Sequence, residues 1–236
     1  MGLNRSSKNK DIVFHHVFQP IVHLASQTLH GYEALLRAEQ FPSPVEFFHH
    51  ARKHHLLFEL DMESIDQALD TNWNIPEGQF LYINIFPSTI VHPTFLTRVQ
   101  QMSSKAKISP SQVVLEINEG ETIESFQALK GQLEILRQEG FRIALDDVGK
   151  GKYPLLTIVE LGPDIIKFDR YFAKNFVDSS INQAYIEKML HELGDQYQVV
   201  LEGLETAEDI EVAKQIGVEL GQGYYLGRPL PLEQHG

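Results

Sequence analysis

The sequence predicts an α/β fold, a modified TIM (β/α)8 barrel with one antiparallel strand near the N-terminus. From residue 79 onward, short β-branched or aliphatic runs alternate with longer segments of helical periodicity. This alternation is typical of a parallel sheet with right-handed crossovers. Eight strand-like segments within 236 residues fit a closed barrel better than an open sheet. The first two segments form a hairpin, so one early strand is expected to run against the others.

The first part of the chain predicts a hairpin followed by a helical pair. Two apolar-rich segments, 13–24 and 28–39, flank a short turn and predict antiparallel strands. Residues 45–71 follow two prolines and show helical periodicity, which predicts two helices. Residues 1–11 are polar and predict a disordered tail, so we expect one domain over 12–236.

The second part of the chain supplies the alternating strands and helices. The predicted strands are 80–85, 113–117, 141–146, 164–168, 198–202 and 220–226. The predicted helices are 93–103, 122–139, 154–161, 180–195 and 207–216. Pro87 predicts a turn after the first of these strands, and Gly140 and Gly217 predict two helix ends.

The composition excludes several classes of protein. A formal charge of −12 argues against binding of polymeric nucleic acid, which requires Lys and Arg to neutralise phosphates. No apolar run approaches about 18 residues, so no membrane insertion is expected. The polar start lacks the apolar stretch of a secretory signal. Cysteine is absent, which excludes disulfides and thiolate metal sites. We therefore expect a cytoplasmic protein.

Polar side chains stand where the apolar runs of the predicted strands stop. They are Asn84, Glu116, Asp146, Asp147, Lys167, Glu202 and Gln222. In a parallel barrel the C-terminal strand ends meet at one mouth, so we expect these side chains to converge. Carboxylates brought close together repel one another unless cations lie between them. Carboxylate and amide oxygens suit hard cations such as Mg²⁺ or Mn²⁺, so the pattern indicates a metal site and hydrolytic or transfer chemistry.

The acidic residues also have structural interpretations that the sequence leaves open. The pair Asp146-Asp147 is typical of a turn cap as well as of a metal site. An E-x-x-E spacing recurs after two strands, as Glu116 with Glu119 and as Glu202 with Glu205. Acids at such positions are also favoured at helix starts by the helix dipole. The recurrence of the pair in similar places favours a shared functional role.

Lys167 and the histidine pairs have their own alternatives. Lys167 could orient a water molecule or stabilise a phosphate oxygen, and the alternative is a salt bridge to Asp164 or Asp169. Adjacent histidines face different directions on a helix and opposite faces on a strand, so we expect surface or structural roles for them. These pairs are His15-His16, His49-His50 and His54-His55.

Eight motifs, taken in order, resemble the EAL family of cyclic di-GMP phosphodiesterases, which is named for the tripeptide Glu33-Ala34-Leu35. They are FQPIV at 18–22, YEALLR at 32–37, INIFP at 83–87, LEINE at 115–119, ALDDVGKG at 144–151, DIIKFDR at 164–170, LEGLET at 201–206 and QGYYLGRPLP at 222–231. The resemblance runs from Phe18 to Pro231. It implies that 12–236 form an EAL phosphodiesterase domain with a modified (β/α)8 barrel. The implied reaction is metal-dependent hydrolysis of cyclic di-GMP to linear pGpG, which lowers the level of this second messenger.

The resemblance also implies roles for individual residues. Two Mg²⁺ or Mn²⁺ ions would be held by Glu33, Asn84, Glu116, Asp146, Asp147 and Glu202. The implied catalytic residues are Lys167, Glu202, Glu119 and Glu205. Lys167 would position or activate the attacking water, with Glu202 as a possible base. Glu119 would order the loop after the aspartate pair, and Glu205 would support the site. The implied substrate contacts are Gln19, Glu33, Leu36, Arg37 and Gln222.

The loop at 148–154 departs from the family pattern. The family usually follows its aspartate pair with Phe-Gly-Thr-Gly and a serine-rich stretch, whereas this chain has Val-Gly-Lys-Gly-Lys-Tyr-Pro. In the family this loop links dimer contacts to the metal site, so the resemblance implies a homodimer whose coupling is altered. The alternative function is therefore a catalytically weak or inactive cyclic di-GMP receptor of EAL type that acts through a protein partner.

Overall fold

The computed structural model describes residues 12–71, 76–118, 126–149 and 155–235. Its strands are β1 (Phe14–His23), β2 (Thr28–Ala38), β3 (Phe80–Ile85), β4 (Val113–Asn118), β5 (Arg142–Val148), β6 (Ile165–Phe168), β7 (Gln198–Glu202) and β8 (Leu220–Gln222). Its α-helices are α1 (Pro44–Lys53), α2 (Leu57–Asp70), α3 (Pro87–Ile90), α4 (Phe95–Ser103), α5 (Phe126–Gln138), α6 (Leu155–Leu161), α7 (Ser180–Leu193) and α8 (Ala207–Gln215). The predicted tail at 1–11 lies outside the described residues.

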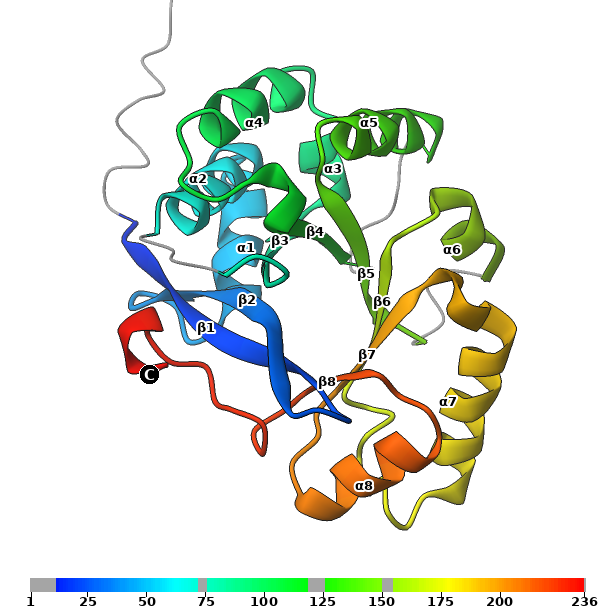
Figure 1. The fold of residues 1–236 in the computed structure, drawn as a ribbon. Coiled ribbons are helices and arrows are strands. Elements are labelled where there is room, and N and C mark those ends of the chain that lie inside the picture. Colours follow the sequence, from blue (N-terminus) through cyan, green and yellow to red (C-terminus); the bar gives the residue numbers. More distant parts are fainter. Residues whose placement is uncertain (1–11, 72–75, 119–125, 150–154, 236) are drawn as a thin grey trace, which may run out of the picture.

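The eight strands close into a barrel in chain order, with helices around it (Figure 1). β1 runs antiparallel to both of its neighbours, β2 and β8. All other neighbouring strands are parallel. The prediction of a modified (β/α)8 barrel with one antiparallel strand near the N-terminus is therefore confirmed.

Two elements differ from the sequence-based expectation. The turn predicted at Pro87 is the short helix α3, which has proline in its first turn, where the missing N–H costs nothing. The last strand ends at Gln222 instead of continuing to residue 226. Gly223 packs so closely on Leu204 that an added Cβ would lie 2.0 Å from the Leu204 carbonyl oxygen. The chain therefore turns around Leu204, and the Tyr225 N–H donates to that oxygen at 3.3 Å.

The inside of the barrel is packed with apolar side chains. They are Ile21, Phe80, Tyr82, Val114, Ala144, Ile165, Val200 and Leu220. Because side chains on a strand alternate between faces, residues two positions apart point the same way. Val114 precedes Glu116 by two positions, and Ile165 precedes Lys167 in the same manner. A polar layer at the strand ends therefore rests directly on an apolar floor inside the barrel.

The C-terminal segment pairs with β1 along the edge that faces β8. Phe18 and Leu230 exchange two backbone hydrogen bonds, of 2.7 and 3.0 Å. His235 contacts the Phe18 carbonyl oxygen through Nε2 at 2.7 Å and packs its ring against Tyr32. In Figure 1 this red segment runs beside β1 and ends near it. The segment also brings the carbonyl of Gly227 to Gln19, whose side-chain amide donates to it at 3.1 Å.

Candidate active site

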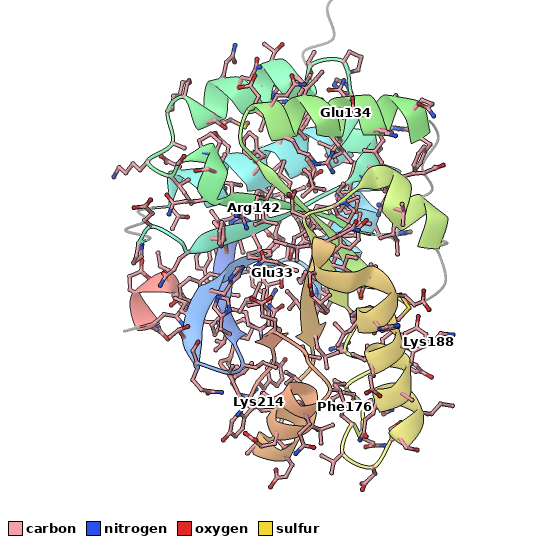
Figure 2. All side chains as sticks on the ribbon, turned by 45° about the vertical axis from the view of Figure 1, so that its right-hand side comes forward. Glu33, Glu134, Arg142, Phe176, Lys188 and Lys214 are labelled. Carbon is pink, nitrogen blue, oxygen red and sulfur yellow. The ribbon has the colours of Figure 1, made fainter. Side chains whose placement is uncertain are left out.

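Lys167 lies at the centre of the polar layer, enclosed by four carboxylates from four different strands. Its Nζ lies 3.1 Å from Glu33 Oε2, 2.7 Å from Glu116 Oε1, 3.5 Å from Asp146 Oδ1 and 2.8 Å from Glu202 Oε1. The lysine side chain is completely buried, and Figure 2 shows Glu33 at the middle of the barrel. The predicted convergence of strand-end residues is therefore what the structure has. Asp164 serves a different purpose, because its carboxylate accepts the Ile143 N–H at 2.8 Å.

Neutral amides complete the polar layer and hold Glu33 from two sides. The Asn84 amide donates to Glu33 Oε1 at 2.9 Å and to Glu116 Oε2 at 3.2 Å. The Gln222 amide donates to Glu33 Oε2 at 2.7 Å, and it lies 3.4 Å from Gln19 Oε1. Gln19 and Glu33 face each other across the antiparallel pair of β1 and β2. Glu33 is thus fixed by three strands besides its own.

Burial and charge act differently on the carboxylates of this layer. Burial raises the pKa of Glu116 well above its ordinary value, and the neighbouring charge of Glu33 adds to the effect. Burial raises the pKa of Glu202 to about 8 although Lys167 acts in the opposite sense. Burial also acts to raise the pKa of Glu33, but Lys167 and the amide hydrogen bonds outweigh it and lower the pKa. The pKa shifts differ among these carboxylates because a single ammonium group is shared by four acids.

Lys167 carries the positive charge that faces these four carboxylates. Burial acts to lower the pKa of its ammonium group, but the surrounding carboxylates, Asp146 and Glu116 first among them, raise it well above the ordinary value. The lysine is therefore charged at neutral pH. Its charge balances only one of the four acids, so the layer carries an excess of negative charge wherever more than one acid is ionised.

A second acidic group adjoins the first and shares Glu202 with it. Asp147, Asp169 and Glu202 each present an oxygen within 4.8 Å of the other two. Asp147 has a left-handed backbone, with φ of 59°, where the register between β5 and β6 shifts. Aspartate tolerates this conformation better than most residues, and such conformations cluster at functional sites. This irregularity within β5 accompanies the placement of Asp147 beside Asp169 and Glu202.

Asp169 is the site residue that the sequence interpretation missed. From the sequence, Asp169 is expected only as a possible salt-bridge partner for Lys167. It is buried, and its Oδ1 accepts the Tyr171 N–H at 2.7 Å. The available signal was its spacing, because Asp169 stands two positions after Lys167, directly beyond the end of β6. An acid directly beyond a strand end is the signal that the sequence offers, while the direction of Asp169 depends on the turn that follows β6.

The donor set fits divalent cations. Two buried oxygens, Glu116 Oε1 and Asp146 Oδ1, accept no hydrogen bond within the described part of the chain, although both lie close to the Lys167 ammonium. One ammonium group has three protons and cannot satisfy four carboxylates together with the acids beside them. Carboxylate and amide oxygens without soft sulfur ligands are the set that Mg²⁺ and Mn²⁺ prefer.

The polar layer opens into a cavity of about 380 Å³, which we call the mouth cavity. It is lined by, among others, Gln19, Glu33, Leu35, Arg37, Glu205 and Gln222. Leu36 lies on the other face of β2, where it packs with Phe14, Phe47 and Ala51. Most of the predicted substrate contacts are thus brought to one cavity, whereas Leu36 is placed away from it. Glu119 lies outside the described residues, as does most of the 148–154 loop.

Two further expectations concern histidines and membranes. His16 Nε2 lies 3.0 Å from Ser64 Oγ, and burial lowers its pKa to about 4. The His50 ring packs on the His54 ring, with centroids 4.2 Å apart. These contacts agree with structural roles.

Within the described ranges, no helix is both long enough and apolar enough to cross a membrane.

Comparisons with known proteins find the EAL domain and relatives named as cyclic di-GMP phosphodiesterases. The family model for the EAL domain matches residues 3–229. The probable cyclic di-GMP phosphodiesterase PdeG of Escherichia coli is 32% identical over 238 residues, which cover 97% of this chain and 46% of that protein. The cyclic di-GMP phosphodiesterase PA2567 of Pseudomonas aeruginosa is 32% identical over 94% of this chain and 39% of that protein. This chain thus spans less than half the length of either relative.

A solved structure supports the same comparison. Klebsiella pneumoniae BlrP1, in a complex with manganese and cyclic di-GMP, superposes with a TM-score of 0.81. It is 31% identical in sequence, and the match covers 92% of this chain and 56% of that one. The same protein is also known in a complex with calcium and cyclic di-GMP.

Proposed function

We propose that this chain, which belongs to the EAL domain family, hydrolyses cyclic di-GMP to linear pGpG with the help of two divalent cations. The observation that carries this proposal is the enclosure of one buried lysine by four strand-end carboxylates. That arrangement leaves negative charge for cations to balance at the floor of an open cavity. The relatives named as cyclic di-GMP phosphodiesterases and the BlrP1 complexes support the choice of substrate.

The proposed cation ligands follow the two acidic groups. Glu33, Asn84, Glu116 and Asp146 would hold one ion, and Asp146, Asp147 and Glu202 would hold the other. Asp169 adds a carboxylate beside Asp147 and Glu202. Bound Mg²⁺ or Mn²⁺ would lower the pKa of a water molecule and stabilise charge on the phosphoryl oxygens. The choice between these two ions stays a prediction.

The protein's own groups would then orient the reactants and move protons. Lys167 holds Glu33 and Glu202 in place, with contacts of 3.1 and 2.8 Å, and would orient the attacking water. The water oxygen attacks phosphorus, and Glu202 accepts the proton that the water loses. The bond from phosphorus to the ribose 3′ oxygen breaks, and that oxygen takes up a proton. The apolar floor below the layer excludes water from that side, which strengthens these interactions.

The remaining catalytic and substrate assignments are proposals of the same kind. Gln19, Arg37 and Gln222 line the mouth cavity and would contact the substrate. Glu205 lines it as well, and its backbone N–H is held by Asp209 Oδ2 at 3.2 Å. Glu119 keeps its proposed role on the family resemblance alone, whereas Leu36, which packs behind β2, is not proposed as a substrate contact.

The proposal is tested by incubating purified protein with cyclic di-GMP and either Mg²⁺ or Mn²⁺, and by resolving products chromatographically. We expect metal-dependent formation of pGpG. Glu33→Ala should abolish turnover while largely preserving the fold, because it removes a ligand at the open end of the barrel. Glu134→Ala, on the exposed face of α5, is the matched control and should leave activity unchanged (Figure 2).

Two other outcomes would redirect the assignment. Binding of cyclic di-GMP without turnover would support the alternative, a receptor that acts through a protein partner. If the protein neither binds nor cleaves cyclic di-GMP, both proposed functions are contradicted. Retained turnover in Glu33→Ala would contradict the ligand set.

We also propose that the protein forms a homodimer. The start of α7 and the loop before it expose apolar side chains at Ile181 (78%) and Val177 (45%), which suits an interface. Light scattering should give twice the chain mass, and Ile181→Asp should reduce it if this surface is used. A regulatory protein partner and a cytoplasmic location stay predictions.

A further inference from the structure

Two histidines meet at the end of the barrel opposite the mouth cavity, and the proposed reaction uses neither of them. His23 is the last residue of β1, the strand that begins beside the mouth and runs against its neighbours. His30 lies in β2, near the start of that strand. His23 Nε2 and His30 Nδ1 are 3.2 Å apart, and the two rings stand at 79° to each other.

A bulge in the hairpin brings His30 to this position. The register of β1 and β2 shifts between Ile21 and Val22, which leaves His30 as an extra residue on β2. Bulges of this kind redirect a side chain. An added Cβ on the next residue, Gly31, would lie 2.3 Å from the Phe80 carbonyl oxygen, so this part of β2 lies directly against β3. The His30 side chain is 2% exposed as a result.

The outer nitrogen of each histidine has a partner of its own. His30 Nε2 lies 2.8 Å from Tyr82 Oη, inside the barrel. His23 Nδ1 lies 3.7 Å from Glu219 Oε1, at the surface. Histidines that bind a metal through one nitrogen usually direct the other N–H to a carboxylate or another oxygen, which fixes the tautomer and the ring orientation. Both rings are therefore oriented with their inner nitrogens toward one point.

The distance between the inner nitrogens fits a single metal ion. Two nitrogens that bind tetrahedral zinc at about 2.0–2.1 Å lie about 3.3 Å apart. The observed distance of 3.2 Å between His23 Nε2 and His30 Nδ1 is close to this value. The His23 side chain is 32% exposed, which gives an ion access from solvent. Among the residues that the structure describes, no third acidic or histidine ligand joins the pair, so water would complete the coordination.

The chemistry of this pair differs from that of the acidic layer. Imidazole nitrogens suit zinc, nickel and copper, whereas the carboxylate and amide oxygens of the layer suit Mg²⁺ and Mn²⁺. Metals bind the neutral form of histidine. Burial, followed by the charges of His23 and Arg142, lowers the pKa of His30 to about 4, so His30 is neutral at physiological pH.

Arg142 is a cation near the pair, and it has partners elsewhere. Its guanidinium lies 4.3 Å from the centroid of the Phe80 ring and donates to Gln198 Oε1 at 3.3 Å. Its positive charge opposes a bound cation at the histidines. Removal of this charge should therefore strengthen metal binding there by at least about threefold.

We propose that His23 and His30 form a binding site for a transition-metal ion of the zinc type at the end of the barrel opposite the mouth. When the ion binds, the proton on His23 occupies Nδ1, where Glu219 faces it, and the proton on His30 occupies Nε2, where Tyr82 accepts it. Both inner nitrogens then offer a lone pair to the metal. The ion would join β1 to β2 at the closed end of their hairpin. This inference involves neither cyclic di-GMP nor the acidic layer.

The experiment measures zinc binding by calorimetric titration in a large excess of Mg²⁺. Mg²⁺ competes for the oxygen ligands of the acidic layer and leaves imidazole nitrogens to zinc. The variants are His23→Gln, His30→Gln and the control His49→Gln, which alters an exposed histidine on α1. Loss of an outer partner of a metal ligand weakens binding about 10- to 100-fold, so loss of either ligand should weaken it at least about tenfold. The control should bind zinc as wild type does.

Two further measurements locate the ion. Arg142→Gln should bind zinc more tightly than wild type, because it removes the opposing charge (Figure 2 labels Arg142). X-ray absorption of wild type with one equivalent of zinc should show imidazole nitrogens at about 2.0–2.1 Å. The same spectrum of His23→Gln should show fewer of them.

The alternative results are distinguishable. The site is overturned if wild type binds no zinc in excess Mg²⁺, or if His23→Gln or His30→Gln binds it with unchanged affinity. Loss of binding in His49→Gln with normal binding in His30→Gln places the ion on α1 and also overturns the site. Equal or weaker binding by folded Arg142→Gln contradicts the location. If His30→Gln does not fold, His23→Gln decides, because its side chain lies at the exposed end of the pair.

Discussion

Replacing Lys167 by methionine should destabilise the protein strongly in the absence of divalent cations. Methionine keeps much of the side-chain volume but removes the charge that faces four carboxylates at 2.7 to 3.5 Å. Removing one partner of a buried ion pair costs about 3–5 kcal/mol, because the remaining charge is left uncompensated. An unfolding entropy of about 2.1 cal/mol/K per residue gives about 0.5 kcal/mol/K for 236 residues, so Tm should fall by about 6–10 °C.

Divalent cations should reverse part of this loss. Without Lys167 the acidic layer carries one more negative charge, so cation binding should contribute more to the stability of Lys167→Met than to that of wild type. At a Mn²⁺ concentration about 100-fold above the dissociation constant, each site adds about 2.7 kcal/mol to the free energy of unfolding. We therefore expect the difference in Tm between variant and wild type to shrink when Mn²⁺ replaces a chelator.

The assay is thermal unfolding followed by circular dichroism, in chelator and in Mn²⁺. Lys214→Met is the matched control, because Lys214 pairs with Glu211 at 2.8 Å on the surface (Figure 2). Such an exposed pair contributes about 0–1 kcal/mol, so the control should unfold close to wild type in both conditions. If Lys167→Met unfolds with the control in chelator, Lys167 does not compensate the acidic layer as described here.

Two further predictions concern other parts of the barrel. Burial, followed by the charges of His23 and Arg142, lowers the pKa of His30 from 6.5 to about 4, so the unfolded chain binds the proton first as pH falls. The stability contributed by neutral His30 is then complete above pH 6.5 and is lost toward pH 4, by up to about 3 kcal/mol. Urea midpoints at several pH values should show a smaller decline in His30→Gln, and an identical decline would contradict this account. Leu36→Ala should lower the free energy of unfolding by about 2–5 kcal/mol with KM unchanged, because Leu36 packs behind the strand. A raised KM with normal stability would instead support a substrate contact, and Leu35→Ala is the comparison.

The barrel and the acidic layer were predictable because both follow from a period of two along the strands. Glu116, Lys167 and Glu202 each end an apolar run, and the closed sheet brings such ends together. Once the strands were assigned, no knowledge of the loops was needed to place these side chains. The antiparallel first strand was equally accessible, because its hairpin partner follows after a short turn.

The remainder depended on backbone geometry that periodicity does not describe. Asp169 lies beyond the end of β6, and its direction is set by the turn in which it accepts the Tyr171 N–H. The end of β8 is set by the contact between Gly223 and Leu204. No sequence pattern indicates that these two residues are in contact. Leu36 shows the limit of a resemblance, because a neighbouring position in a motif can face the other side of its strand.

The reversed direction of β1 determines where the beginning of the domain emerges. His15 pairs with Arg37, so the first residues of β1 stand at the rim of the mouth cavity. The other barrel strands begin at the opposite end. A polypeptide or tag joined ahead of residue 12 would therefore be tethered beside the mouth cavity, and its bulk or charge would act on access to that cavity.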